Sequence, residues 1–319
     1  MRTLITGAEG FIGGYLSASL REDGQEVLHG IYRPGPGYAP GPAPREVPCD
    51  LNDRARVREV LARERPEVVY HLGALSDAHG SWQHPAETIR TNVLGTLHLF
   101  EGLREEGLSP RVFVAASSAE YGYTARHAHT LVEEDELRPV HPYGLSKVCQ
   151  DLLSLQYHQA YGLPVIRGRI FNTIGPGKTG DAPSDFARQL VEVERGRRDH
   201  VEVGNLDTVR DFMDVRDMVR AIRQVTERGA PGEVYNLCTG TPVRLDELLH
   251  GILRQSRTPV TVHREPSRCR AADEPWIVGD NRKLRALGGW APRIPLDQTL
   301  QDIVEQWRGV ALPPTPLPG

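Results

Sequence analysis

The sequence has few cysteines and no long apolar run, and these absences exclude several classes of protein. Its 319 residues include four cysteines, and no two of them form a C-x-x-C pair: Cys49, Cys149, Cys238 and Cys269. Scattered thiols favour reduced, structural cysteines over a disulfide framework. The longest apolar runs are too short to span a bilayer, so we expect no membrane contact.

An excess of positive charge is also absent. The formal net charge is −4, so bulk electrostatics gives no support to a nucleic-acid partner. The chain enters a predicted strand at once in MRTLITG, which leaves no room for a signal peptide, and we expect a cytoplasmic protein. The histidines lack zinc-ligand spacing, so no metal is expected. We place four of them in loops that line a substrate cleft: His79, His84, His127 and His129.

Strand-like and helix-like segments alternate through the first half of the chain. Short apolar runs such as residues 3–7 and 111–118 are separated by helical patterns such as residues 53–66 and 86–107. This alternation predicts an α/β fold, a Rossmann-type doubly wound parallel sheet with helices on both faces. Residues 33–48 are rich in proline and glycine and are expected to form a loop.

A glycine pattern follows the first predicted strand and opens the first helix. Gly7, Gly10 and Gly13 form G-x-x-G-x-x-G, with Phe11 and Ile12 between the last two. Such glycines allow a tight turn and a close approach of backbone to a pyrophosphate, whose charge the helix N-terminus favours. A strand before the pattern and a helix after it predict a dinucleotide-binding loop.

The end of the second predicted strand bears on cofactor choice. A carboxylate at this position would accept hydrogen bonds from the adenosine ribose of NAD, but the strand ends at Tyr32-Arg33. Arg33 suits the 2′-phosphate of NADP, so we expect NADP(H), with NAD(H) as the alternative; a solvated arginine opening a loop is the other interpretation. Asp50 and Leu51 follow a short third strand and are expected near the adenine.

Three residues form a candidate catalytic group. Tyr143 and Lys147 are four residues apart on a helix predicted to begin near Pro142, so they share one face. A nearby ammonium favours the phenolate and lowers the pKa of a tyrosine from about 10, which suits acid-base catalysis. Lys147 can also hold a nicotinamide ribose. Ser117 ends a predicted strand, where its hydroxyl can bond the reacting oxygen.

These segments together resemble a known family. TGAEGFIG, DLND, HLGA, TNVLGT, SSAEYG and YGLSK are similar, in this order, to motifs of the extended short-chain dehydrogenases/reductases, which act on nucleotide sugars. Downstream, FNTIGPG, VGNLDTVRDFMDVRDMVRAI and GEVYNLCTG resemble the branch that contains GDP-mannose dehydratases and GDP-4-keto-6-deoxymannose reductases. The match is closer to the reductases and extends over most of the chain.

The resemblance implies further contacts. The cofactor would also meet Leu72, Gly73, Ala74, Asn92, Tyr143 and Lys147. The substrate candidates are Ser76, Ser118, Asn172, Arg188, Arg210 and Asp273. Asn172 would contact the sugar diphosphate, Arg210 the diphosphate or its ribose, and Asp273 the nucleotide ribose. Arg188 would lie near the base. Family members carry glutamate at the Asp273 position in R-P-x-E, whereas this chain reads RAAD. The segment around Arg210 could instead supply charges at a helix entrance, with Asp214 as the cap.

The character of the chain changes near Asn172, where glycine and proline become more frequent. We predict a NADP-binding Rossmann domain over residues 1–171, to which later segments return. Residues 172–312 are expected to form mainly a smaller, partly interleaved domain that binds the nucleotide sugar. Residues 313–319 are expected to form a flexible tail.

Ala119 occupies a position that separates the possible reactions. Dehydratases resembling this chain need a carboxylate two residues after the catalytic hydroxyl, whereas the methyl group of Ala119 can neither take nor give a proton. Glu120 is adjacent, but one step along the chain turns a side chain away. Ala119 therefore argues against dehydration without establishing reduction, because similar reductases can keep glutamate there.

The leading prediction is an oxidoreductase of deoxysugar biosynthesis that uses NADPH to reduce the C4 ketone of a GDP-4-keto-6-deoxyhexose. Tyr143 would protonate the alkoxide, Ser117 would polarise the ketone and Lys147 would tune Tyr143. The alternative is a nucleotide-sugar C4 epimerase with tightly bound NAD, which needs the same three residues. A dehydratase and a non-catalytic NADP-sensing module are less favoured.

The resemblance also implies a homodimer. Family members pair the helices that hold Asn92 and Tyr143 across a two-fold axis into a four-helix bundle. These helices carry Leu97, Leu152 and Leu155, which could equally cover the sheet.

Overall fold

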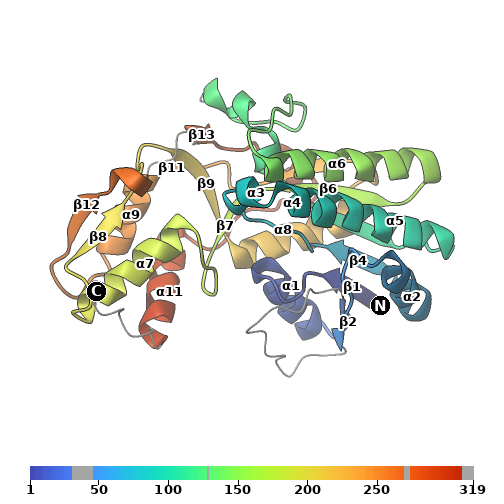
Figure 1. Cartoon of the computed structure of the whole chain (residues 1–319), viewed down its shortest axis with the longest axis horizontal. Helices are drawn as coiled ribbons and strands as arrows, with labels where there is room; N and C mark the ends of the chain where they lie inside the picture. The colour runs from blue at the N-terminus through green and yellow to red at the C-terminus, as the bar shows by residue number, and fades with distance from the viewer. Residues whose placement is uncertain (31–45, 128, 269–273, 311–319) are drawn as a thin grey trace.

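The computed structural model describes residues 1–30, 46–127, 129–268 and 274–310. Figure 1 shows two lobes, a larger one built around a sheet and a smaller one that contains α7 (Ala182–Glu194), α9 (Leu245–Leu253) and α11 (Leu296–Gly309). In the described residues, no helix combines the length and the apolar character needed to cross a membrane.

The larger lobe contains a seven-stranded sheet in the order β10-β6-β5-β4-β1-β2-β3. All neighbouring pairs run parallel. The strands are β1 (Arg2–Thr6), β2 (Glu26–Gly30), β3 (Glu46–Val47), β4 (Val68–His71), β5 (Arg111–Ser117), β6 (Val165–Ile170) and β10 (Val234–Leu237). The strand order reverses direction between β1 and β4, which in doubly wound sheets marks the ligand crevice at the carboxyl ends. The predicted fold class is confirmed.

Helices cover both faces of this sheet. One face packs against α1 (Phe11–Glu22) and α8 (Val215–Arg228) through a core that includes Leu16, Leu20 and Met218. The other face packs against α2 (Arg54–Glu64), α5 (Gly95–Glu105) and α6 (Pro142–Tyr161). Because both faces are covered, strands such as β4 are buried along their whole length and read as continuous apolar runs.

The helix predicted over residues 86–107 contains a local irregularity. It is divided into α4 (Pro85–Ile89), a π-helical turn (Arg90–Leu94) and α5. The turn places Asn92 in the interior, and such π-turns often occur at functional sites. Shorter helices are α3 (Gly80–Gln83), α10 (Arg282–Ala286) and the 3-10 turns Ser118–Glu120, Tyr123–His127 and Pro266–Arg268.

The smaller lobe has its own sheets and its own core. β9 (Val209–Asp214) pairs with β7 (Asn172–Ile174), β11 (Pro242–Arg244) and β13 (Trp276–Ile277), and β8 (His200–Val203) pairs with β12 (Thr261–Arg264). A separate cluster of apolar side chains joins α7, α9 and α11 to these strands.

The two lobes are interleaved along the chain. β10 and α8 come after residue 172 in the chain but belong to the larger lobe. β9 passes directly into α8 at Asp214, whose carboxylate accepts a hydrogen bond from the Arg216 amide at 2.8 Å and caps the helix. The boundaries given above for the two domains stay predictions.

Candidate active site

A cleft of about 900 Å³ opens at the carboxyl ends of the central strands and extends to the smaller lobe. Its walls contain residues from the glycine loop, from the ends of β4 and β5, and from the start of α6. The smaller lobe contributes Asn172, Thr173, Lys178, Arg210 and Ile277. This position matches the crevice expected from the strand order.

The glycine loop is packed too tightly for side chains. Gly7 has a φ of +70°, and a Cβ there would lie 2.8 Å from the Cα of Gly73. A Cβ on Gly13 would lie 2.1 Å from the Gly7 carbonyl oxygen. Gly10 caps α1 without a side chain, and Gly7, Gly10, Phe11, Ile12 and Gly13 all line the cleft. The loop therefore brings bare backbone and a helix N-terminus to the cleft, as a dinucleotide pyrophosphate requires.

The segment after β4 forms the opposite wall of this loop. Leu72, Gly73 and Ala74 line the cleft, and the Gly73 amide donates to the Thr6 hydroxyl at 2.9 Å. A Cβ on Gly73 would lie 3.0 Å from the Thr6 hydroxyl oxygen, so this position is close-packed.

Three of the proposed cofactor residues lie outside the described lining of the cleft. Asn92 is fully buried, and its amide bonds both backbone groups of Leu75 and the hydroxyl of Ser146. Leu51 is buried against Gly73, and the Asp50 carboxylate accepts a bond from the Asn52 amide. These three residues do not line the described cleft, so their cofactor contacts stay predictions. Arg33 lies outside the described residues.

The three residues of the candidate catalytic group lie together in the cleft. Ser117 ends β5, Tyr143 and Lys147 lie on α6, and all three line the cleft. The Ser117 side chain lies near the Tyr143 hydroxyl and lowers its pKa. The Lys147 ammonium lies 5.8 Å from the centre of the Tyr143 ring and donates to the Ala115 carbonyl and to Gln150, each at 2.8 Å.

The pKa of Tyr143 moves in the direction opposite to the one predicted. It is raised to about 12, mainly by burial; the neighbouring Ser117 lowers it and the charge of Glu120 raises it. Burial is the largest of these effects, so the predicted net lowering of the Tyr143 pKa is wrong for this site. Burial lowers the pKa of Lys147 to about 8. At neutral pH the site therefore holds a protonated phenol beside an ammonium, and a protonated phenol is a proton donor.

The two residues after Ser118 differ sharply in surroundings. Ala119 lines the cleft, where it offers only a methyl group. Glu120 is fully buried; it accepts a bond from the Ser117 amide at 2.7 Å and lies 3.2 Å from Arg169. Burial and the neighbouring Asp151 raise the pKa of Glu120 well above its usual range. Its carboxyl group turns away from the cleft and cannot replace the acid that Ala119 lacks.

Four of the six substrate candidates meet in the cleft, namely Ser76, Ser118, Asn172 and Arg210. The side-chain nitrogen of Asn172 is buried and lacks a hydrogen-bond partner among the described residues, which makes it available to a ligand. The Arg210 guanidinium donates to the Val209 carbonyl at 2.9 Å. Asp273 lies outside the described residues.

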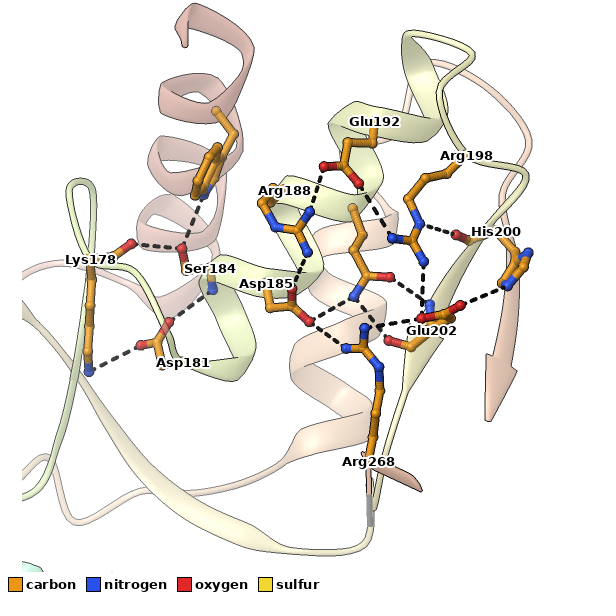
Figure 2. Close-up of polar contacts among 12 residues, drawn as sticks. Lys178, Asp181, Ser184, Asp185, Arg188, Glu192, Arg198, His200, Glu202 and Arg268 are labelled. Carbon is orange, nitrogen blue, oxygen red and sulfur yellow. Dashed lines mark hydrogen bonds and ion pairs between the residues drawn. The ribbon is translucent and has the colours of Figure 1, made fainter. Parts of the chain in front are cut away.

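Arg188 lies outside the described lining of the cleft. Figure 2 shows it on α7 between Asp185 and Glu192, at 2.6 and 2.5 Å. Arg268 also contacts Asp185, at 2.9 Å, and Glu202, at 3.1 Å. These ion pairs make Arg188 part of a network within the smaller lobe, and its contact with the nucleotide base stays a prediction.

Some cleft residues were not found from the sequence. His141, Lys178 and Glu274 line the described cleft, and their types gave no signal by themselves. Of the histidines that were placed there, His79 lines the cleft, but His84 is exposed outside it. His129 instead lies 3.2 Å from Asp135, and the placement of His127 stays a prediction. Among the described residues, no cluster of three or more metal-ligating side chains occurs.

The chain is similar to several known proteins. Residues 4–303 match the profile of the family described as GDP-mannose 4,6 dehydratase. The chain belongs to this family. The GDP-6-deoxy-D-mannose reductase of Pseudomonas aeruginosa is 31% identical over 312 residues, which cover 96% of this chain and 97% of the relative.

Solved structures of similar proteins share the fold of this chain. The structure of RMD from Pseudomonas aeruginosa complexed with NADPH is 29% identical, with a TM-score of 0.84 over 97% of this chain and 99% of that chain. The UDP-glucose 4-epimerase of Thermus thermophilus, solved in complex with NAD, is 26% identical, with a TM-score of 0.86 over 98% and 100% of the two chains. The resemblance to the nucleotide-sugar branch is confirmed, and the chain is an enzyme.

Proposed function

We propose that this enzyme uses NADPH to reduce the C4 ketone of a GDP-4-keto-6-deoxyhexose. One observation carries the proposal: a protonated Tyr143 and the Ser117 hydroxyl line a cleft in which Ala119 supplies no acid. This arrangement suits delivery of one proton to a ketone oxygen. The 31% identity to GDP-6-deoxy-D-mannose reductase supports the choice of reaction and of substrate. The dehydratase name of the family does not fix the chemistry, because one fold serves several reactions.

The glycine loop would hold the cofactor, which supplies the hydride when bound. Gly7, Gly10 and Gly13 leave backbone amides and the N-terminus of α1 open to the pyrophosphate. Arg33 would pair with the 2′-phosphate that distinguishes NADP from NAD. The relative solved with NADPH supports NADP(H), and the epimerase solved with NAD keeps NAD(H) as the alternative.

The chain's own residues would manage the proton. The Ser117 hydroxyl would donate a hydrogen bond to the C4 oxygen and polarise the ketone. As negative charge develops on that oxygen, the Tyr143 hydroxyl would donate its proton, and the Lys147 ammonium would stabilise the phenolate that remains. Burial of Tyr143 and Lys147 strengthens these interactions, because water screens them less.

The substrate would bridge the two lobes. The Asn172 amide nitrogen and the Arg210 guanidinium would contact the diphosphate or its ribose, since both line the cleft on the side of the smaller lobe. Ser76 and Ser118 would bond sugar hydroxyls near the reacting carbon. Asp273 and Arg188 stay candidates for the ribose and the base.

A C4 epimerase is the second candidate, because a relative of that activity has the same fold at a TM-score of 0.86. An epimerase would use the same three catalytic residues but would return the hydride to its own substrate and keep its cofactor. A reductase must exchange the cofactor in every cycle. The fate of the cofactor therefore separates the two functions.

The test incubates purified protein with NADPH and a panel of GDP- and UDP-4-keto-6-deoxyhexoses. We expect loss of NADPH absorbance with one GDP substrate and one molecule of product for each NADPH consumed. Parallel reactions contain a GDP-hexose or a UDP-hexose with no keto group and no added cofactor. Catalytic C4 inversion in these reactions, with NAD retained through gel filtration, would replace the reductase by the epimerase.

We also propose that two copies of the chain form a dimer through α6 and the helix of α4 and α5. Large apolar side chains on this face are exposed: Trp82 by 60%, Leu94 by 44%, Leu145 by 49% and Leu152 by 51%. Trp82, Leu94 and Leu145 also line an apolar pocket of about 710 Å³. Of the three leucines noted in the sequence, Leu97 packs against the core, whereas Leu152 is exposed.

Sedimentation would test this dimer. Leu145→Glu together with Leu152→Glu should yield a monomer, and Tyr161→Glu, on the same helix, is the matched control. A wild-type monomer at micromolar concentration would exclude the dimer. We separately propose that the protein is cytoplasmic.

A further inference from the structure

Two helices of the larger lobe begin with the same His-Pro pair, but their histidines behave differently. α4 follows His84, whose side chain is exposed and makes no capping hydrogen bond. α6 follows His141, whose Nδ1 atom accepts a hydrogen bond from the Gly144 amide at 2.9 Å. Helix caps are usually Ser, Thr, Asp or Asn, which accept this bond at neutral pH and do not lose it near pH 6. A histidine cap differs because its acceptor can be protonated.

The capping bond fixes the protonation state of His141. A backbone amide can donate only to a ring nitrogen with a free lone pair, and both nitrogens of an imidazolium carry protons. His141 must therefore be neutral, with its proton on Nε2. Burial lowers the pKa of His141, while the carboxylate of Glu274 acts in the opposite direction. The site thus favours the form that makes the cap.

The capped turn is the one that carries Tyr143. Its ring stacks on the His141 ring, with centroids 5.9 Å apart and an interplanar angle of 26°. Gly144 packs closely on the 3-10 turn Ser118–Glu120, where a Cβ on Gly144 would lie 2.7 Å from the Ala119 carbonyl oxygen. The Leu145 amide donates to the His141 carbonyl at 3.1 Å. His141 therefore caps the turn that carries Tyr143, and Gly144 packs this turn against the segment that begins at Ser117.

We propose that His141 is a positioning residue: its neutral imidazole holds Tyr143 against Ser117, and its protonation in acid releases the first turn of α6 and stops turnover. The inference rests on the proposed function in so far as Tyr143 is the proton donor. Glu274 is the charged group that acts on the ring, and Tyr143 stacks on it. The cleft and the apolar pocket that His141 lines also contain three other titratable or charged residues: His79, Arg90 and Lys147. Glu274 can stabilise the imidazolium, but it cannot restore the lost acceptor for the Gly144 amide.

The pH dependence of turnover in three proteins tests the proposal. In wild type, kcat should fall by up to about tenfold per pH unit below the His141 pKa, as expected when one proton inactivates the enzyme, with little change in KM. His141→Asn should keep turnover at neutral pH, because its amide oxygen accepts the same hydrogen bond. Its kcat should no longer show the fall at low pH, which is the acid limb of the pH profile. His84→Asn is the matched control at the other His-Pro pair and should keep the limb. An unchanged acid limb in His141→Asn would overturn the proposal.

A measurement on the ligand-free protein keeps the proposal independent of the reaction. In wild type, the nuclear magnetic resonance shift of the Gly144 amide should follow the titration of the His141 ring, with the neutral ring protonated on Nε2. In His141→Asn the Gly144 amide should not titrate in this range. A neutral ring protonated on Nδ1 would contradict the cap. If no protein turns over a keto sugar, the proposed function fails, and the resonance titration still decides whether the cap is controlled by protonation.

Discussion

The ammonium group of Lys147 donates a hydrogen bond to the side-chain carbonyl of Gln150, 2.8 Å away in the interior. The amide of Gln150 in turn donates to the Thr96 hydroxyl, which also lies 2.8 Å from the His71 ring. The other nitrogen of His71 bonds the Thr6 hydroxyl beneath the glycine loop. A chain of buried polar groups thus connects Lys147 with Thr6, whose hydroxyl accepts a hydrogen bond from the Gly73 amide in the cleft.

The first prediction concerns the charge of Lys147. Its pKa is lowered to about 8, so turnover should decline above pH 8 as the ammonium is lost. Gln150→Glu places a carboxylate at the same contact, favours the charged form and should move this basic limb upward by about one pH unit or more. Gln150→Leu should move it downward. Gln83→Glu makes the same chemical change at an exposed position and should leave the limb in place. An identical limb in Gln150→Glu would contradict the role given to Lys147.

The second prediction concerns the proton donor. Tyr143→Phe should leave folding and cofactor binding nearly intact and lower turnover by about 100-fold or more, the usual scale for a positioned acid-base group. The control is Tyr161→Phe, because Tyr161 lies at the exposed end of the same helix. Steady-state turnover and cofactor titration measure both quantities. Near-native turnover in Tyr143→Phe would remove this residue from the mechanism.

The third prediction concerns stability in acid. Burial and the charge of Lys147 lower the pKa of His71 to about 3, well below the ordinary value of about 6.5. The unfolded chain therefore binds a proton that the native state rejects, and stability falls as the pH drops below 6.5. The His71 contribution amounts to about 1.4 kcal/mol per pH unit, or ~2 kcal/mol between pH 6.5 and 5.

Urea unfolding at several pH values would measure this contribution. His71→Asn should have a shallower dependence of unfolding free energy on pH than wild type. The exposed His84→Asn serves as the control and should keep the wild-type slope. Equal slopes in wild type and His71→Asn would show that His71 is not the titrating group.

The fourth prediction concerns cofactor choice. If Arg33 pairs with the 2′-phosphate, Arg33→Ala should weaken NADP binding by about tenfold or more while changing NAD binding little, as expected for the loss of a charge-assisted hydrogen bond. The measurement is the ratio of the two dissociation constants in each protein. A wild type that prefers NAD, or a ratio that the substitution leaves unchanged, would show that Arg33 does not read the phosphate.

Local spacing allowed much of this site to be predicted from the sequence. The glycine loop, Ser117, Tyr143 and Lys147 each follow from short patterns, because a strand end, a tight turn and one helical turn place their residues within a few positions. The order of strands and helices gave the fold class for the same reason. The cleft then brings these segments together at one edge of the sheet.

Features that depend on packing between distant segments could not be predicted. The raised pKa of Tyr143 comes from burial, which a helical spacing does not reveal. Asn92 faces Leu75 and Ser146 because a π-helical turn rotates it inward, and Arg188 faces its own helix neighbours. His141 and His84 precede proline alike, and only the tertiary structure separates the cap from the exposed residue.

The return of β10 and α8 to the larger lobe limits how this protein can be divided for expression. A fragment of residues 1–171 would end after β6 and would lack both elements. Without β10, β6 would become an open sheet edge, and without α8 the apolar face that includes Tyr70 and Phe113 would lose its cover. Open edges and uncovered apolar faces promote aggregation. A cofactor-binding fragment that folds by itself would therefore need residues 215–237 joined to the N-terminal segment, not a simple truncation.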